Sequence, residues 1–325
     1  MIIAICYDMP TTQELAPDLQ DTLEQVKYVE EHLTLLGHTV KIIPYMGRSQ
    51  EFINNLKATN PNVVWNLFES FQGSEAEQFK GVMLLESAEI SFTGSSVQSM
   101  MFCADKTITN NILKEAGINV PFQYVLNDTE EMPANLYKWI FKPAKLHGSV
   151  AISDKSVMEL YSEKEVVEIL NRARPELEIY AEEYIDGREF SVTLLDRGLG
   201  LLPIAVAEMR FINYPQDKPK ILNYNSKWDE ESEDFKNTKR TFNHAPEDRA
   251  MVAEMIDIAA KTASVLNLEG FARIDFRCDA GRTPWVIDVN PNPGLGDDSG
   301  FMAACRRAGL TPEKAIDAII WAVKR

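Results

Sequence analysis

The chain has 325 residues, 45% of them hydrophobic and 25% charged, which is the balance of an ordinary globular protein with two or three domains. Its formal net charge of −16 disfavours nucleic acid or an anionic membrane as the main partner. The four cysteines include no CxxC pair, no apolar run approaches the roughly 20 residues of a membrane span, and the N-terminus has no basic flank. We therefore expect a cytoplasmic protein whose cysteines are reduced and which has no signal peptide.

The first third of the chain alternates predicted strands with predicted helices. Strands are expected over residues 2–7, 39–43, 62–68 and 90–94. Helices are expected over about 19–36, ended by Gly37, and over about 74–87. This order predicts a parallel sheet with helices on both faces, and so an α/β N-terminal domain over residues 1–96.

The remainder changes character after a predicted helix over 97–116. Four segments read as antiparallel strands, over 137–144, 178–185, 188–195 and 201–211. Residues 213–247 lose the apolar periodicity, which is typical of a functional or disordered segment. A helix over about 247–266, a hairpin-like strand pair over 270–278 and 284–290, and a last helix opened by Thr311 and Pro312 complete the chain. The C-terminal part is therefore expected to be α+β, with domains over 97–178 and 179–325.

The strand pair near the C-terminus carries a group of polar side chains. Asp288 and Asn290 alternate with apolar residues, as do Arg273 and Asp275, so each pair points to one face of its strand. If the strands pair, one face carries two carboxylates, an amide and a guanidinium. Hard oxygen ligands without His or Cys suit Mg²⁺. The plainer alternative is the solvated polar face of a half-buried sheet.

Lysines and a small-residue loop suggest a phosphate site. Lys106 begins a helix, Lys142 ends a strand, and the loop over 147–153 can offer backbone N–H groups to phosphate oxygens. Neither a GxxxxGK[ST] motif nor a GxGxxG after the first strand is present, which excludes a Walker or Rossmann reading. Taken alone, a lysine at a strand end before proline, such as Lys142, is more often simply a solvated side chain.

The segment AEEYIDGREF could line an adenosine pocket. A glutamate such as Glu182 can accept from the adenine amino group, the backbone before Gly187 can meet the ring edge, and Glu189 can bind ribose hydroxyls. The alternative is a charged edge hairpin that prevents aggregation.

These motifs occur in one order: FTGSS…ADK, FKPAKLHGSVAI, EEYIDGREFSV and GFARIDF…VIDVNPNPG. Together they resemble the D-alanine–D-alanine ligase branch of the ATP-grasp superfamily, from about residue 90 to the end. The resemblance implies an ATP-grasp fold with ATP between the central and C-terminal domains. It implies an ADP-forming ligase that converts a carboxylate to an acyl phosphate and joins it to the amine of an amino acid, forming an amide or peptide bond.

The resemblance also implies roles for individual residues. ATP contacts are implied for Lys106, Lys142, His147, Gly148, Ser149, Glu182, Glu183, Ile185 and Glu189. Mg²⁺, with Mn²⁺ as the alternative, is implied at Asp275, Asp288 and Asn290. Stabilisation of the tetrahedral intermediate is implied for Arg273 and the backbone N–H of Gly294. Binding of the acceptor amino acid is implied for Lys227, Trp228 and Ser299.

The sequence departs from the family at several of these positions. Asp288 stands where glutamate is usual, Trp228 where a loop tyrosine is common, and HGS where a serine-rich loop is usual. The N-terminal motif that carries the glutamate for the amine of the first D-alanine is absent. Glu14 is the predicted replacement, and Tyr7, Asp8 and Glu69 are further candidates.

Three readings of the function remain from the sequence. The first is a ligase for a carboxylate and an amino acid, the second is D-alanine–D-alanine ligase proper, and the third is a nucleotide-binding protein without catalysis. All three predict small-molecule partners, no nucleic acid and no membrane. A homodimer is one option for the assembly.

Overall fold

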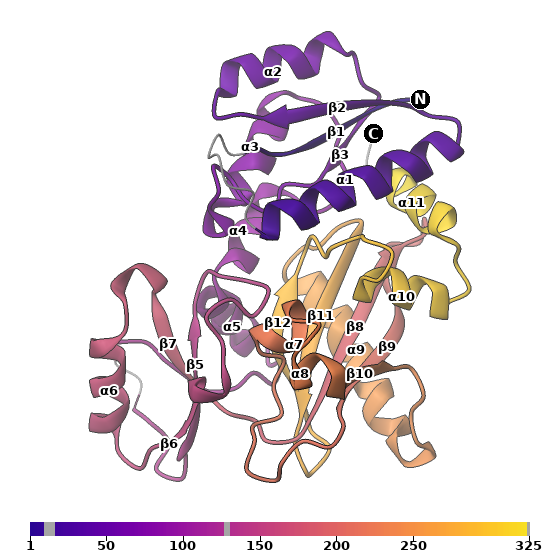
Figure 1. Cartoon of the computed structure of the whole chain (residues 1–325). Coiled ribbons are helices and arrows are strands. Elements are labelled where there is room, and N and C mark those ends of the chain that lie inside the picture. The colour runs from indigo at the N-terminus through magenta and orange to yellow at the C-terminus, as the bar shows by residue number, and fades with distance from the viewer. Residues whose placement is uncertain (10–16, 127–130, 324–325) are drawn as a thin grey trace.

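The computed structural model describes residues 1–9, 17–126 and 131–323, and within them it contains three β-sheets with helices packed around them (Figure 1). The first sheet is parallel, with β1 (Ile2–Asp8) between β2 (Thr39–Tyr45) and β3 (Val63–Asn66). The apolar run of β1 is buried on both faces, as a central parallel strand requires. The predicted parallel-sheet N-terminal domain is confirmed.

Helices cover both faces of this sheet. They are α1 (Pro17–Leu35), α2 (Ser49–Ala58), the 3₁₀ helix η1 (Glu75–Glu77) and α3 (Phe79–Ser87). Ile3 and Ile5 pack into one core with α1, whereas Ala4 and Cys6 pack into another with α2 and α3. Residues 90–94 contribute an isolated bridge between Phe92 and Val64 where a full strand was predicted, and α2 was not predicted.

The helix predicted over 97–116 is two helices, α4 (Val97–Ala104) and α5 (Lys106–Glu115). Asp105 has an extended backbone between them, and its side chain accepts hydrogen bonds from the N–H groups of Thr107, at 2.9 Å, and Ile108, at 3.4 Å. An aspartate that caps a helix in this way begins a new helix. The single-helix prediction is therefore wrong, and the break leaves Lys106 as the first residue of α5.

The second sheet has the order β4-β7-β5-β6. Its strands are β4 (Gln123–Tyr124), β5 (Lys138–Pro143), β6 (Val157–Glu159) and β7 (Ile179–Glu183). Helix α6 (Glu163–Arg172) packs on it through Val166 and Leu170, and the 3₁₀ helices η2 (Asp154–Ser156) and η3 (Pro175–Leu177) lie in its connections. The division at 97–178 and 179–325 stays a prediction, although β7 shares the sheet of β5.

The third sheet has the order β10-β9-β8-β11-β12. Its strands are β8 (Arg188–Asp196), β9 (Leu201–Phe211), β10 (Thr238–Thr241), β11 (Phe271–Cys278) and β12 (Pro284–Asn290). The four segments predicted as antiparallel strands are antiparallel, but they divide between the second and third sheets. The chain crosses between these sheets at Gly187, where a Cβ atom would lie 1.9 Å from the Cys278 carbonyl oxygen.

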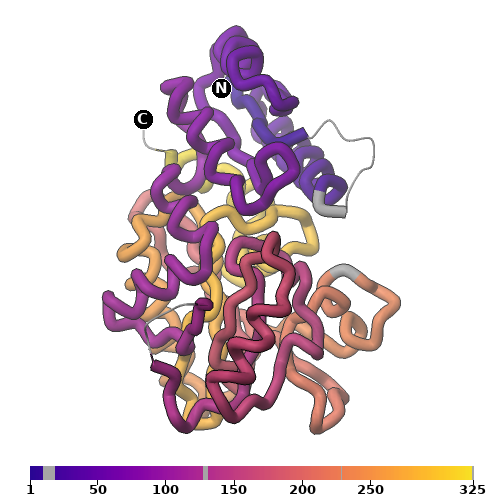
Figure 2. The backbone as a smooth tube through the Cα atoms, turned by 90° about the vertical axis from the view of Figure 1, so that its left-hand side faces the viewer, coloured from indigo at the N-terminus to yellow at the C-terminus, as the bar shows by residue number. Residues whose placement is uncertain are grey.

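The remaining helices surround the third sheet. They are α7 (Tyr224–Trp228), α8 (Glu233–Asn237), the 3₁₀ helix η4 (Pro246–Asp248), α9 (Arg249–Val265), α10 (Gly300–Arg307) and α11 (Pro312–Trp321). Thr311 caps α11 as predicted. Figure 2 shows α11, in yellow, beside the indigo N-terminal part, where it packs on α1. Among the described helices, none is long and apolar enough to cross a membrane.

Candidate active site

The antiparallel pairing of β11 and β12 brings the polar group of the sequence onto one face. Asp275 lies directly opposite Asp288, and Arg273 lies opposite Asn290. The Arg273 guanidinium donates two hydrogen bonds to the Asp275 carboxylate, at 2.8 and 2.9 Å. The register shifts just after Asp275, which bends the strand beside this face.

Lys106 reaches this face from the start of α5. Its Nζ donates to the Leu146 carbonyl oxygen at 2.7 Å and lies 3.9 Å from Asp288 Oδ1. Burial alone would raise the pKa of Asp288, but the surrounding cationic groups, led by Lys106, lower it to about 2. Asp288 is therefore a carboxylate at neutral pH.

The donor set on this face fits a hard cation that takes part of its shell from phosphate. Asn290 Oδ1 already accepts from the Asn292 N–H at 2.9 Å, so its free capacity is one lone pair. Among the described residues, no group of three or more His, Cys, Asp or Glu side chains could hold a metal by itself. The side-chain oxygens of Asp275, Asp288 and Asn290 could therefore supply part of an oxygen shell of the kind that Mg²⁺ completes with water and phosphate oxygens.

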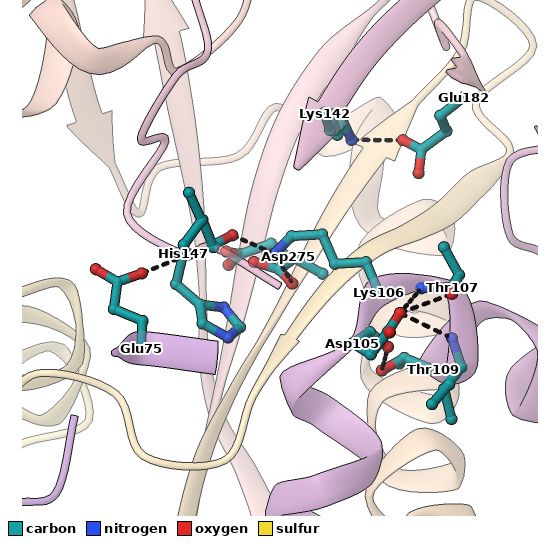
Figure 3. A network of polar contacts seen from close by, with 12 residues as sticks. Glu75, Asp105, Lys106, Thr107, Thr109, Lys142, His147, Glu182 and Asp275 are labelled. Carbon is teal, nitrogen blue, oxygen red and sulfur yellow. Dashed lines mark hydrogen bonds and ion pairs between the residues drawn. The ribbon is translucent and has the colours of Figure 1, made fainter. Parts of the chain in front are cut away.

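Lys142 and Glu182 form a buried pair on neighbouring strands of the second sheet (Figure 3). The Lys142 Nζ lies 2.5 Å from Glu182 Oε1, and Glu182 Oε2 accepts from Gln123 Nε2 at 2.9 Å and from the Tyr180 hydroxyl at 3.0 Å. The two residues predicted for phosphate and adenine thus contact each other directly. A ligand that binds to Lys142 or Glu182 must therefore replace some of these contacts with its own.

The connection between the second and third sheets is held by a residue that the sequence analysis missed. Arg277 is buried, and it donates to the carbonyl oxygens of Ile185, at 3.0 Å, and Gly187, at 3.1 Å. It also donates to Glu189 Oε2 at 3.1 Å and to the Lys220 carbonyl oxygen. Its signal was present, because the alternation that selects Arg273 and Asp275 continues to Arg277.

Glu189 and Glu183, the other two of the three glutamates predicted at the adenosine side, differ in their surroundings. Burial raises the pKa of Glu189, and the charge of Arg277 opposes that rise. Glu183 is half-buried, and its carboxylate accepts from the Phe122 N–H at 3.3 Å. Glu183 therefore supports the backbone beside the connection, whereas Glu189 is a buried carboxylate held by one arginine.

The loop after β5 has an unusual backbone. Gly148, Ser149 and Ala151 all have a left-handed φ, of 64°, 65° and 59°. Such a conformation is uncommon for non-glycine residues and concentrates at functional sites. The His147 N–H donates to Glu75 Oε2 at 2.9 Å (Figure 3), and the Ser149 hydroxyl donates to the Leu222 carbonyl oxygen at 2.6 Å. The N-terminal part and the 213–247 segment both hold this loop.

The 213–247 segment contains the short helices α7 and α8 and is fastened to the same loop. Asn223 caps α7, and its Nδ2 donates to Asp154 at 2.9 Å and to Asp234 at 2.8 Å. Lys218 forms ion pairs with both aspartates. These polar contacts explain why the segment is ordered without an apolar face of its own.

Lys227 of α7 is brought to the β11–β12 face from far along the chain. Burial lowers its pKa, and the positive charge of Arg273 adds to this, while Asp275, Glu189 and Asp288 oppose it. Trp228 ends α7. The predicted acceptor residue Lys227 thus lies among the predicted metal and intermediate-binding groups.

Ser299 lies at the start of α10, and its hydroxyl oxygen accepts from the Met302 N–H at 3.1 Å. Beside it, Arg240 of β10 donates to the Asp298 carbonyl oxygen at 3.3 Å. Burial and the charge of Arg273 lower the pKa of Arg240. Arg240 is therefore a cation close enough to Arg273 to interact with it, on the side of the site where Ser299 lies. The sequence analysis did not select Arg240, because β10 lies in the segment without periodicity.

On the donor side, the predicted Glu14 lies outside the described residues. Asp8 ends β1, and its Oδ2 accepts from the Ser70 hydroxyl at 2.9 Å and the Gly73 N–H at 2.8 Å, so it shapes a turn. Tyr7 is buried in the core that includes α1. Of the further candidates, Glu69 is connected to the backbone at Leu295, next to Gly294, through one intervening side chain.

The side chain that connects Glu69 to this backbone is Gln25 of α1. Glu69 accepts from Thr22 Oγ1 at 3.1 Å and from Gln25 Nε2 at 3.0 Å, and Gln25 Oε1 accepts from the Leu295 N–H at 3.0 Å. Gln25 also lies against Gly294, where an added Cβ would be 3.5 Å from Gln25 Nε2. Burial raises the pKa of Glu69 to about 7, and the neighbouring groups that also act on this pKa within the described part of the chain are neutral or acidic.

Known proteins are similar to this chain in both sequence and fold. The family described as "D-ala D-ala ligase C-terminus" matches residues 112–321. The D-alanine–D-alanine ligase of Moorella thermoacetica is 27% identical over 318 residues, which cover 95% of each chain.

Two solved structures share the fold at lower identity. The Bacillus anthracis D-alanine–D-alanine ligase complexed with ATP superposes with a TM-score of 0.72 at 18% identity, covering 99% of this chain and 96% of that one. The VanG D-Ala:D-Ser ligase of Enterococcus faecalis superposes with a TM-score of 0.69 at 18% identity, covering 99% and 98%. With its family match over most of its length, this chain belongs to the D-alanine–D-alanine ligase family, the ATP-grasp enzymes that join a carboxylate to an amine and form ADP.

Proposed function

We propose that this enzyme phosphorylates a donor carboxylate with ATP and couples it to the amine of an acceptor amino acid that keeps a free carboxylate. The observation that carries the proposal is the convergence at the β11–β12 face. Arg273, Asp275 and Asp288 meet Lys106 from α5 and Lys227 from α7 there. Both steps of such a reaction concentrate negative charge, and cationic groups in a water-poor site stabilise it.

For the first step, Lys106 and Lys142 hold the phosphates of ATP while Glu182, Glu189 and the backbone around Ile185 hold adenosine. The buried Lys142–Glu182 pair supports this role. A phosphate of ATP can replace Glu182 as the partner of Lys142, and adenine can replace Lys142 as the partner of Glu182. Asp275, Asp288 and Asn290 would hold a divalent ion, which would neutralise part of the charge on the phosphates. Mg²⁺ is the proposed ion, since the side-chain donors are all hard oxygens.

For the second step, the amine attacks the acyl carbon and expels phosphate. The Arg273 guanidinium has five N–H groups and donates two of them to Asp275. It can therefore also donate to the tetrahedral intermediate. The Gly294 N–H is the proposed second donor. Lys227, Ser299 and Arg240 surround the proposed place of the acceptor carboxylate.

The donor is proposed not to be restricted to D-alanine, the amino acid for which the relatives are named. The family's N-terminal glutamate motif is absent from this sequence, and Glu69 beside Gln25 and Gly294 takes its place. A carboxyl group with a raised pKa and no cationic partner among the described residues suits a donor that carries an amine, because the positive charge of the amine would favour the ionised carboxylate. The VanG ligase of Enterococcus faecalis, which shares this fold, is named for D-Ser as well as D-Ala.

The test is ATP-dependent phosphate release with a panel of donor and acceptor pairs, with mass spectrometry of the product. Converting the acceptor to its amide should lower kcat/KM far more than exchanging D-alanine for another donor, because buried donors left unpaired cost about 1–3 kcal/mol each. Equal use of amides and free acids would refute the carboxylate site. Exclusive use of D-alanine would identify D-alanine–D-alanine ligase proper, and ATP binding without any turnover would identify the inactive alternative.

We also propose a cytoplasmic location and small-molecule substrates as the partners. The homodimer stays a prediction, which the molar mass in solution tests.

A further inference from the structure

The strand register places Arg240 on the same face of the third sheet as the proposed reaction site. Arg240 of β10 lies opposite Met209 of β9, and Met209 lies opposite Glu189 of β8. Glu189 in turn lies opposite Arg277 of β11. Side chains directly opposite each other in paired strands point to one face, and alternate residues of β11 extend this face from Arg277 to Arg273. Arg240 therefore lies at the β10 edge of the face that carries the proposed catalytic groups.

The guanidinium of Arg240 reaches the residues on both sides of Ser299. Its Nη1 donates to the Asp298 carbonyl oxygen at 3.3 Å, and its Nη2 would lie 3.7 Å from a Cβ atom added to Gly300. Ser299, between these two residues, is proposed to bind the α-carboxylate of the acceptor. Contacts of its own side chain thus place Arg240 beside the acceptor site.

Arg240 carries a positive charge without a negative partner. Among the residues that the structure describes, no carboxylate forms an ion pair with Arg240, whereas the nearby Arg306 pairs with Asp297 at 2.9 Å. Asp298 attracts the Arg240 charge from a distance, while Arg273 and Arg306 repel it. The Arg240 side chain is accessible to solvent, although its neighbours crowd the guanidinium enough to lower its pKa. A guanidinium in such surroundings favours an anionic ligand.

Gly300 leaves space beside this guanidinium. It is the first residue of α10, and its φ is not left-handed, so the backbone does not require glycine there. An added Cβ would contact Arg240, at 3.7 Å from Nη2 and 3.9 Å from Cζ. A larger side chain would therefore cover part of the guanidinium, and the glycine keeps it open to a ligand.

The α-carboxylate of the acceptor already has two proposed partners, the Lys227 ammonium group and the Ser299 hydroxyl. An acceptor with a neutral side chain would cover Arg240 without offering it an anion, which leaves hydrogen-bond donors unpaired. An acceptor with a second carboxylate, on its side chain, would offer two oxygens to the planar guanidinium.

We propose that Arg240 binds the side-chain carboxylate of the acceptor, so that the enzyme prefers an acidic amino acid such as aspartate or glutamate. Nη1 keeps its bond to the Asp298 carbonyl oxygen, and Nη2, on the Gly300 side, donates to the side-chain carboxylate. This preference rests on the proposed function, because it names the substrate class of the same site.

The experiment compares acceptors that differ only in the side-chain charge. ATP-dependent phosphate release with the donor panel gives kcat/KM for aspartate against asparagine and for glutamate against glutamine, each as the D and the L form. We expect the acid of at least one pair to exceed its amide by about tenfold, which is ~1.4 kcal/mol. Calorimetry with ADP and Mg²⁺ present gives the Kd of the same acceptors without a donor, and the acid should bind more tightly by a similar factor.

Two variants should remove the preference in different ways. R240M deletes the guanidinium, whereas G300L keeps it and covers it, so both should bring the ratio of acid to amide close to one. The matched control is Lys239→Met, which alters an exposed cation of the same strand that points to the opposite face of the sheet. K239M should keep the ratio of the wild type.

Two outcomes would overturn the role of Arg240. The first is a wild type that neither uses nor binds any acid better than its amide, and the second is an acid preference that persists in either R240M or G300L. The proposed function fails separately, if no pair of donor and acceptor yields a product. The ratio of the Kd values still decides in that case whether Arg240 selects an acidic side chain.

Discussion

Replacing Arg277 with methionine should destabilise the protein and weaken nucleotide binding together. Methionine fills much of the volume, but it removes hydrogen bonds to the carbonyl oxygens of Ile185 and Gly187 and the ion pair with Glu189. Breaking one side of a buried ion pair costs about 3–5 kcal/mol, because the other charge is left without compensation. We therefore expect the unfolding free energy of R277M to fall by about that amount.

The same residue orients the proposed adenosine contacts, so the apparent Kd for ATP should rise by at least about tenfold, which is ~1.4 kcal/mol. Urea denaturation and calorimetry measure the two effects. Arg172→Met is the matched control, because the Arg172 side chain is 79% exposed and pairs with Glu168 at 3.7 Å, which predicts a change below about 1 kcal/mol.

A double variant separates the ion pair from the volume change. Adding Glu189→Gln to R277M removes the uncompensated charge, so the double variant should be more stable than R277M alone. The reasoning is refuted if R277M unfolds within about 1 kcal/mol of the wild type, or if Glu189→Gln destabilises R277M further.

Asp288→Ala should remove most turnover at millimolar Mg²⁺, because the metal neutralises the phosphates. The control Asp257→Ala, on the exposed side of α9, should keep its turnover. Full activity of D288A would exclude the proposed metal site. Trypsin should cut the free protein first within residues 223–238, and ATP with substrates should protect this segment, as expected of a lid that shields an acyl phosphate from water; equal cutting rates in both states would count against a lid. The raised pKa of Glu69 means that the folded protein keeps, between pH 4.5 and about 7, a proton that the unfolded chain has lost, so stability falls as the pH rises through this window. Glu69→Gln should abolish that fall, which amounts to up to about 3 kcal/mol of unfolding free energy. If the unfolding free energies of the variant and the wild type depend on pH in the same way, Glu69 is not buried as a neutral acid.

The sequence was sufficient for features that depend on neighbouring residues. The alternation around Asp275 and Asp288 is local, and strand geometry alone places alternate side chains on one face. Thr311 and Pro312 likewise mark a helix start by themselves. The order of the motifs was sufficient for the family, because it extends over most of the chain.

Some local features were misread because two signals competed. The apolar spacing over 97–116 continues through Asp105, so the periodicity favoured one helix, and the capping carboxylate prevailed in the structure. Strand type was predicted correctly for 137–211, but sheet membership was not, since the turn at Gly187 directs the chain into another sheet.

Only the tertiary structure decided which side chains share the site. Arg240 was not selected from the sequence, whereas Lys227 was selected through the resemblance and Glu69 as one of several candidates. Lys227 and Arg240 lie near the charge of Arg273, and Glu69 contacts Gln25, because distant parts of the chain pack together. Their pKa shifts arise from burial and from neighbouring charges, and both exist only in the folded protein. A local pattern therefore specifies which face of a strand is polar, whereas the charges that surround this face depend on contacts between residues far apart in sequence.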